Sequence, residues 1–428
     1  MSAPPVSRLG FRGLFSKRMR AVDRAGLRTV MARPEYRRLW AARTVSQWGD
    51  VAQFTTLALL VLRLTGSGLG VSGAVLAEIV PVLLLAPVAG PLVDRLPRVR
   101  VMVAADLARL VLAATLALWH SDIGVVYAVA FGLSAGSVFF NPAAGSLLPS
   151  LVGEEELVAA NSGIWSAAVL SQVLLAPVAG LLASTAGFGW AFAMNAGSFG
   201  VSALLLRGLR ASEAARPLVT ASIWVQGREA LGLLGRDRLL RALALAQALA
   251  ALSAGATSAL LVLLAARRLH AGGGGYGLML AGIGVGAFCG PLLLTRLGTR
   301  ARQPRLVFAA FGLRGVVDVV LASVTTLPVA LSALVCYGMG TSSGNVTFSS
   351  VIQSHVPEQL RGRVFSAFDL IWQAMRLASL LLGGVLADAF GIRAVYYCGG
   401  LLLLAAGLAG LTTSADLPSD GSSPGATQ

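Results

Sequence analysis

Apolar runs long enough to span a lipid bilayer recur through almost the whole 428-residue chain, separated by short polar segments. A helix needs roughly 20 predominantly apolar residues to cross the hydrocarbon core. Only 12% of the residues are charged, against about 25% in soluble domains. The runs are continuous and do not alternate, which argues against a membrane β-barrel. The sequence therefore predicts an all-α, polytopic membrane protein.

We expect twelve transmembrane helices, in two sets of six on either side of one longer polar segment. The first six lie near 39–62, 69–92, 99–119, 124–144, 158–183 and 188–206, and the second six near 239–265, 276–297, 305–325, 327–351, 364–387 and 393–411. The expected divisions are an N-terminal arm (1–36), a first half (37–206), a central loop (207–238), a second half (239–412) and a tail (413–428).

Arginines concentrate in segments that fall on one side of the predicted bundle, and the net charge is +15 at pH 7. These segments are the N-terminal arm, the turn at 93–100, the central loop, 296–305 and 361–363. Positively charged loops stay in the cytoplasm. We therefore expect a multi-pass protein of the cytoplasmic (inner) membrane with both termini inside the cell. Topology accounts for the excess charge, so we expect the basic arm to contact lipid and expect no nucleic-acid partner.

The sequence offers little that is typical of an enzyme or a metal site. Cys289, Cys336 and Cys398 fall in three different apolar runs, a spacing that indicates neither a metal site nor a disulfide framework. There is no Walker sequence, which argues against an ATP-driven pump. No loop is long enough for a catalytic domain, and no nucleophile lies in a pattern with a base. We expect no enzymatic activity, no cofactor and no metal.

The two halves repeat each other at nearly one offset. Asn345 follows Asn141 by 204 positions, and Gly384 follows Gly180 by the same 204 positions, each within a block of similar residues. Tandem six-helix halves are related by a pseudo-twofold axis along the membrane normal and bind substrate near the midplane between them. The repeat therefore predicts a central site at the interface of the halves.

A short charged turn separates the second and third apolar runs. Residues 90–100 read G-P-L-V-D-R-L-P-R-V-R, which resembles the signature loop G-x-x-x-D-R-x-G-R-R of the major facilitator superfamily. The matching residues are Gly90, Asp94, Arg95, Arg98 and Arg100, whereas Pro97 replaces the second glycine and Val99 separates the paired basic residues. The resemblance implies a secondary transporter in which these five residues form a gating loop.

Further residues are similar to bacterial efflux members of the superfamily, of the enterobactin-exporter and macrolide-efflux kinds. They are Gly49-Asp50, Asn141-Pro142 and the segment Leu-Arg-Gly-Arg-Val at 360–364. The resemblance implies a monomeric, proton-coupled antiporter that exports small amphipathic drugs, antibiotics or siderophore-like molecules by alternating access. Two departures weaken proton antiport: the fourth run has no arginine where many such exporters carry one, and 176–180 matches the antiporter pattern Gly-Pro-x-x-Gly-Gly only in part.

Two other functions stay open on the sequence. One is uptake or facilitated diffusion of a nutrient through the same fold. The other is a membrane receptor or scaffold that transports nothing. A fold alone does not identify a substrate or a direction.

Ionisable residues inside spanning helices are costly and are usually functional. Asp50 lies near the middle of the first predicted helix, with Gln53 one turn away, and the resemblance places this helix against the central cavity. Three roles are open for Asp50. It takes and releases protons, it binds a cationic or polar substrate together with Gln53, or it hydrogen-bonds a neighbouring helix.

Glu78 and Arg376 fall at matched depth in the second and eleventh predicted helices, which the resemblance packs together. We expect an ion pair between the halves. The alternative is that Arg376 binds an anionic substrate while Glu78 is protonated. The resemblance also predicts that Asp94 braces the N-terminus of the eleventh helix when the protein faces outward.

Two pairs of charges are expected to be structural, and a further aspartate is expected to be solvated. Asp106 and Arg109 are three positions apart, and Arg314 and Asp318 are four apart, so each pair shares a helix face. The resemblance makes their helices peripheral, and we expect two structural ion pairs. Asp388, near a helix end, is expected to be solvated.

Overall fold

The structure is a computed structural model that describes residues 26–209, 235, 237–296 and 303–415. Every regular element in this part of the chain is a helix, which confirms the all-α prediction. Most of the predicted N-terminal arm, most of the central loop and the C-terminal tail lie outside the described residues. The boundaries drawn at those three segments stay predictions.

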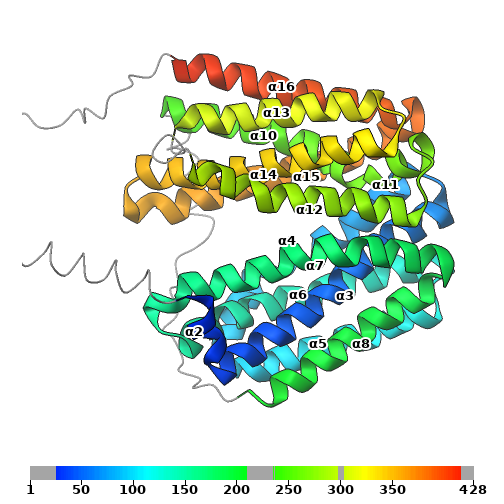
Figure 1. Ribbon diagram of the computed structural model, residues 1–428, viewed down its shortest axis with the longest axis vertical. Helices are drawn as coiled ribbons and strands as arrows, with labels where there is room; N and C mark the ends of the chain where they lie inside the picture. Colours follow the sequence, from blue (N-terminus) through cyan, green and yellow to red (C-terminus); the bar gives the residue numbers. More distant parts are fainter. Residues whose placement is uncertain (1–25, 210–234, 236, 297–302, 416–428) are drawn as a thin grey trace, which may run out of the picture.

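Six long helices form the N-terminal half (Figure 1). They are α3 (Pro34–Thr65), α4 (Gly68–Arg95), α5 (Arg98–Leu118), α6 (Ile123–Leu151), α7 (Leu157–Thr185) and α8 (Phe188–Arg207). The short helix α2 (Leu27–Ala32) precedes them, and the single turn η1 (Glu154–Glu156) joins α6 to α7.

Six long helices also form the C-terminal half. They are α10 (Arg238–Ala259), α12 (Gly273–Thr295), α13 (Pro304–Ser323), α14 (Leu327–His355), α15 (Glu358–Phe390) and α16 (Ile392–Ala415). The short helix α11 (Leu261–Leu263) and the π-helical turn η2 (Leu264–Arg268) extend α10.

Ten helices of the described chain are long and apolar enough to cross a membrane. The two remaining long helices, α3 and α14, carry more polar residues, among them Gln47, Asp50 and Gln53 in α3 and a Thr-Ser-Ser run at 341–343 in α14. The apolar spans therefore establish a multi-pass helical membrane protein, and the count of twelve spans stays a prediction.

Tight turns join neighbouring helices, as the short polar segments predicted. Helix α4 ends at Arg95 and α5 begins at Arg98, so the charged motif is the tip of a helical hairpin. Gly66 ends α3 with φ 61°, a left-handed conformation that glycine adopts without steric penalty. The next residue, Ser67, begins α4 by accepting a hydrogen bond from Gly70 N–H at 3.2 Å.

The two halves pack against each other through α7 with α12 and through α4 with α15. Glycines allow the first of these contacts to be very close. A Cβ atom on Gly180 would lie 2.0 Å from the carbonyl oxygen of Gly273, and one on Gly277 would lie 2.2 Å from that of Ala176. No larger residue fits at either glycine, so the two backbones touch directly.

A carboxylate also joins the halves at this end of the bundle. Asp388 of α15 accepts hydrogen bonds from Ser67 Oγ at 2.6 Å, Gly68 N–H at 2.6 Å and Leu69 N–H at 3.0 Å. Arg267 donates to the Gly66 carbonyl beside it. Asp388 is exposed, as expected, and its side chain in addition caps α4 of the other half, which the sequence did not predict. We call this end of the bundle the closed end.

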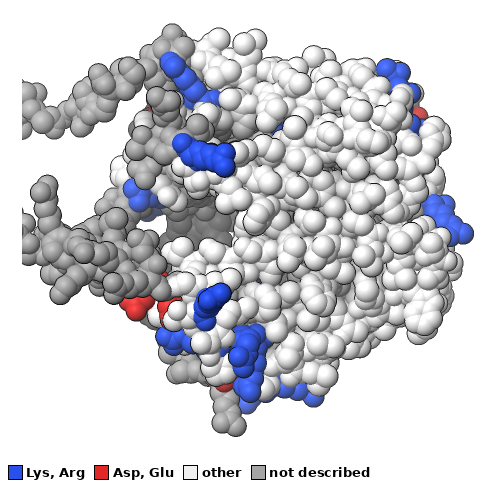
Figure 2. Space-filling model, viewed as in Figure 1, with Lys and Arg blue, Asp and Glu red and all other residues white. Residues whose placement is uncertain are grey.

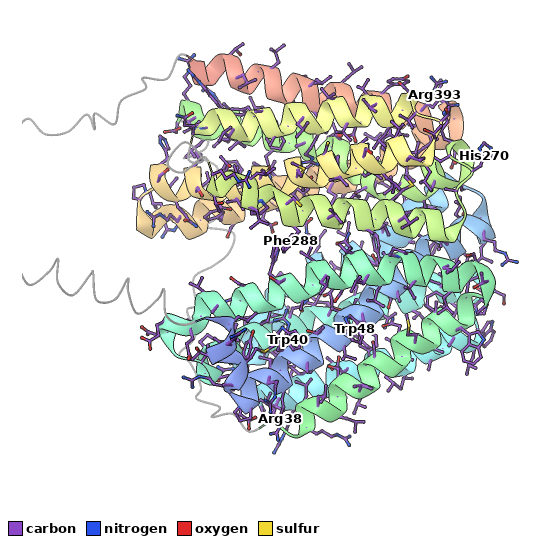
Figure 3. All side chains as sticks on the ribbon, viewed as in Figure 1. Arg38, Trp40, Trp48, His270, Phe288 and Arg393 are labelled. Carbon is purple, nitrogen blue, oxygen red and sulfur yellow. The ribbon has the colours of Figure 1, made fainter. Side chains whose placement is uncertain are left out.

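At the opposite end, where α2 begins and α16 ends, the two halves diverge (Figure 1) and the surface is hollowed between them (Figure 2). We call this the open end. Most of the visible arginine side chains lie near it, with a smaller group at the closed end (Figure 2). Arg38 lies near the open end, and Arg393 and His270 lie at the closed end (Figure 3).

Candidate functional site

A cavity of about 480 Å³ lies where the halves begin to separate. Its walls come mainly from α3, α4, α6 and α7, and α12 of the other half contributes Leu280. Three of the four residues predicted to bind protons or substrate line it together: Asp50, Gln53 and Glu78. The fourth, Arg376, does not reach its wall. The depth argument predicted Glu78 beside Arg376, whereas this cavity brings Glu78 together with Asp50.

Asp50 opens into this cavity and is backed by a buried arginine. Its side chain is 40% exposed, and its Oδ2 lies 4.0 Å from Nη1 of Arg109, which is only 2% exposed. The Arg109 Nη2 bonds to Asp106 Oδ1, one turn earlier on α5. One guanidinium thus lies between two carboxylates, one in the protein interior and one in the cavity wall.

Aromatic rings hold the Arg109 guanidinium in place. Its central carbon lies 4.6 Å from the ring centre of Phe140 in α6 and 4.3 Å from that of Phe199 in α8. Its Nη1 also donates to Ser137 Oγ at 3.3 Å, and Ser137 lines the cavity. A cation between two aromatic faces is stabilised by their quadrupoles.

The predicted ion pair of Asp106 and Arg109 is therefore confirmed, and α5 itself contributes no residue to the described lining of either cavity. Arg109 lies behind the cavity wall, where it contacts Asp50 and Ser137. It also lies over a ring of α6, the helix whose own missing arginine weakened the case for proton antiport. The spacing of three positions within one helix indicated the pair. This spacing could not predict the contact between Arg109 and Asp50, because that contact depends on how α5 is rotated relative to α3.

Gln53 is tied to a neighbouring helix. Its Oε1 accepts a hydrogen bond from the amide of Asn195 in α8. Gly49 allows α8 to come this close, since a Cβ on Gly49 would lie 2.0 Å from Ser198 Oγ. The Gly49-Asp50 pair therefore combines a close helix contact with a carboxylate that faces the cavity.

Glu78 and Arg376 face each other across the boundary of the halves. Helix α4 packs on α15, and each of these two residues is the principal charged neighbour of the other. They do not lie within the 4.0 Å of an ion pair. The backbone of Arg376 packs on α10. A Cβ on Gly255 of that helix would lie 2.8 Å from the carbonyl oxygen of Arg376.

A smaller cavity of about 190 Å³ adjoins the first, with Phe54, Gln172 and Leu280 lining both. It extends into the C-terminal half, where Asp318 and Tyr396 line it. Among the described residues, the charged ones that line the two cavities are Asp50, Glu78 and Asp318, and no arginine lines either cavity. Together the cavities present carboxylates and apolar side chains to whatever enters.

The predicted ion pair of Arg314 and Asp318 is not formed. Arg314 instead donates to the Tyr337 hydroxyl at 3.0 Å, and Asp318 Oδ2 accepts from Ser253 Oγ at 3.4 Å. The other oxygen of Asp318, Oδ1, has no hydrogen-bond partner among the residues that the structure describes. Spacing of four positions allowed the pair, but partners on α14 and α10 turn the two side chains apart.

The signature-loop residues lie at the open end, away from the cavity. Arg98 is buried at the start of α5, and Arg95 and Arg100 are exposed. The side chain of Asp94 is outside the described part of the chain, so its predicted gating role stays a prediction. Nearby, Phe288 is 46% exposed and extends from α12 into the space between the halves (Figure 3).

The sequence profile of the Major Facilitator Superfamily matches residues 39–380, with a second match at 243–426. The chain belongs to this superfamily. It is therefore a secondary transporter for small molecules, and not an enzyme.

Curated relatives of this superfamily member are distant and include export proteins. The multidrug efflux pump Tap of Mycolicibacterium fortuitum is 29% identical over 390 residues, which cover 86% of this chain and 93% of that protein. Macrolide efflux protein A of Streptococcus pyogenes is 24% identical over 380 residues, which cover 86% of this chain and 92% of that protein. An uncharacterized transporter, YfiS of Bacillus subtilis, is 27% identical over 389 residues.

Solved structures with the same fold are still more distant in sequence. The nucleoside transporter NupG aligns with a TM-score of 0.71 at 13% identity, covering 88% of this chain and 98% of that one. A bacterial homologue of the iron transporter ferroportin, in an inward-facing state, also aligns with a TM-score of 0.71, at 20% identity, covering 89% and 98%. These likenesses establish the superfamily fold.

Proposed function

We propose that this transporter exports small amphipathic molecules from the cytoplasm in exchange for protons. The observation that carries the proposal is the pair of carboxylates, Asp50 and Glu78, that open into one cavity between the halves. The names of two relatives, a multidrug efflux pump and a macrolide efflux protein, support export as the direction.

The shape and lining of the cavities fit an amphipathic ligand. Small-molecule sites are typically clefts of about 300–1,000 Å³ with apolar walls and a few polar groups. The larger cavity, of about 480 Å³, combines Phe54, Leu133 and Leu280 with the amides of Gln47 and Gln172. The apolar side chains favour the body of the ligand, and the amides and carboxylates favour its polar groups.

Proton exchange follows from competition at the carboxylates. In the proposed cycle both termini are cytoplasmic, so the open end faces the cytoplasm. There, Asp50 and Glu78 release protons and bind substrate. When the halves rock and the closed end opens, protons from outside displace the substrate. A carboxylate that serves both ligands couples their opposite movements without any direct contact between them.

The test uses inside-out membrane vesicles that contain the full chain and a pH-sensitive dye. A panel of cationic, neutral and anionic fluorescent dyes serves as the probe. Proton movement that requires both the probe and an intact Asp50 supports the proposal. Probe flux without proton movement would instead indicate facilitated diffusion. Absence of flux for every probe, with normal membrane insertion, would indicate a receptor or scaffold.

A further inference from the structure

We infer that Arg109 is a positioning residue that competes with the proton for Asp50, and that Asp106 shares the charge of Arg109 and so limits this competition. The inference rests on the proposed function, in which Asp50 takes and releases a proton. It assigns a role to a buried charge pair that belongs to no wall of the cavity.

The guanidinium of Arg109 is fixed, so it cannot follow Asp50. Asp106, Phe140, Phe199 and Ser137 contact it from three different helices. Its aliphatic stem is also confined, because a Cβ on Gly136 would lie 2.7 Å from Arg109 Cγ. The Asp50 side chain is much freer, at 40% exposed. Any change in the 4.0 Å contact therefore comes from movement of Asp50.

The charges that face Asp50 come from two other helices. Helix α5 contributes Arg109 and Asp106, and α4 contributes Glu78, which has Arg376 behind it. The helices α6, α7 and α8 contribute uncharged groups to this region, namely Ser137, Gln172 and Asn195. Arg109 is therefore the cation nearest to Asp50 and the only one within 4.0 Å among the described residues.

Loss or gain of a proton then switches the position of Asp50. The ionised carboxylate is attracted to Arg109, which favours the 4.0 Å contact. The protonated carboxyl group has no charge to be attracted, while Arg109 stays neutralised by Asp106. The protonated Asp50 side chain is then free to turn further into the cavity. The switch links proton binding to the shape and charge of the substrate site.

Arg314 provides a matched control. It follows Arg109 by 205 positions in the repeat, is also buried, and also lies over an aromatic ring, with its central carbon 4.9 Å from the Tyr337 ring centre. Its surroundings hold no carboxylate that lines the larger cavity. Replacing either arginine by glutamine removes a buried cation from an aromatic site, but only one replacement removes the counter-charge of Asp50.

The experiment is an infrared titration of the purified, full-length protein in a Glu78→Gln background. The carboxyl band of Asp50 is assigned by its loss in Asp50→Asn. Arg109→Gln should raise the midpoint of this band by about one to three pH units, since an opposite charge within about 4–6 Å has an effect of that size. Arg314→Gln should leave the midpoint in place, and Arg109→Lys should restore part of the shift.

Unchanged midpoints in folded Arg109→Gln and Arg109→Lys would overturn the inference. If Arg109→Gln fails to fold, Asp106→Asn gives an independent test, because it leaves Arg109 with Asp50 as its carboxylate partner and should lower the midpoint. The titration does not require transport. A shifted midpoint in a protein without proton-coupled flux would support the role of Arg109 and refute the proposed antiport. An unchanged midpoint in a protein with proton-coupled flux would refute the role of Arg109 and support the antiport.

Discussion

Asp388 in the C-terminal half accepts a hydrogen bond at 2.6 Å from the hydroxyl of Ser67 in the N-terminal half. The same carboxylate also receives the first two backbone N–H groups of α4. An anion at a helix N-terminus is stabilised by the helix dipole and by the unpaired N–H groups there. The closed end is therefore held in part by a cap that one half supplies to the other.

Asp388→Asn should favour opening of the closed end. Loss of an exposed charge at a helix N-terminus costs about 0.3–1 kcal/mol, which is a shift of about two- to fivefold in the ratio of the two states. Spin-label distances across the closed end measure this ratio. Asp122→Asn is the control, because Asp122 caps α6 within its own half. Equal distance distributions in the two variants would refute the prediction.

Asp94→Asn should act in the opposite direction. Asp94 lies one residue before the end of α4 at the open end, and Asp388 lies two residues before the end of α15 at the closed end. The resemblance predicts that Asp94 braces the N-terminus of α15 when the open end closes. The variant should therefore increase the population that is open to the cytoplasm. A cysteine introduced in the cytoplasmic part of the cavity should react faster with a thiol reagent. An unchanged rate would count against this gating role.

Asp50→Asn should abolish uphill transport and leave counterflow of the substrate measurable. The amide keeps the size of the side chain but takes up no proton, so substrate exchange no longer depends on the proton gradient. The readout is transport by reconstituted protein with and without a pH gradient, at equal expression. Full proton-driven transport in this variant would remove Asp50 from the mechanism.

Glu78→Arg and Arg376→Glu should each impair transport, and the double swap should restore part of it. Breaking a buried ion pair by removing one partner costs about 3–5 kcal/mol, because the other charge stays behind. In this structure the two residues face each other without pairing, so we expect the pair to form in another state of the cycle. Two stably inserted single variants with no rescue in the double variant would indicate separate roles.

Asp237 should stabilise the C-terminal half in a pH-dependent way. Its carboxylate lies at the open end, accepts Leu240 N–H at 2.8 Å and lies 2.9 Å from His355 Nε2. Burial raises the pKa of Asp237, but the hydrogen bonds from Leu240 and His355 outweigh it and leave the pKa below its usual value. A lowered pKa stabilises the folded state above the ordinary value of about 3.9 and loses this effect as pH falls through the folded value.

The measurement is the melting temperature of Asp237→Ala in detergent at pH 7 and near pH 3. Loss of an aspartate cap costs about 0.5–2 kcal/mol, so the variant should melt lower at pH 7 and differ less near pH 3. His355→Ala should have a smaller effect, because the Leu240 bond survives. An equal deficit at both pH values would show that the charge of Asp237 is irrelevant.

Hydropathy and helical rise predicted which polar residues lie at the middle of the bundle. Asp50, Gln53 and Glu78 line one cavity because they lie at similar depth, which can be counted along the chain. Contacts between helices were much harder to predict. The approach of Arg109 to Asp50 depends on helix rotation, and the cap by Asp388 joins segments more than 300 positions apart. No local sequence pattern predicts either of these two contacts.

The glycine contact between α7 and α12 has a mechanical consequence. Because backbone touches backbone at Gly180 and Gly273, no side chain separates the two helices at this point when one half tilts against the other. Helix α12, with 23 residues, is about 35 Å long. Each degree of tilt about its first residues then moves its far end by about 0.6 Å. The contact can serve as a fulcrum, where a small rotation produces a wide opening at the other end.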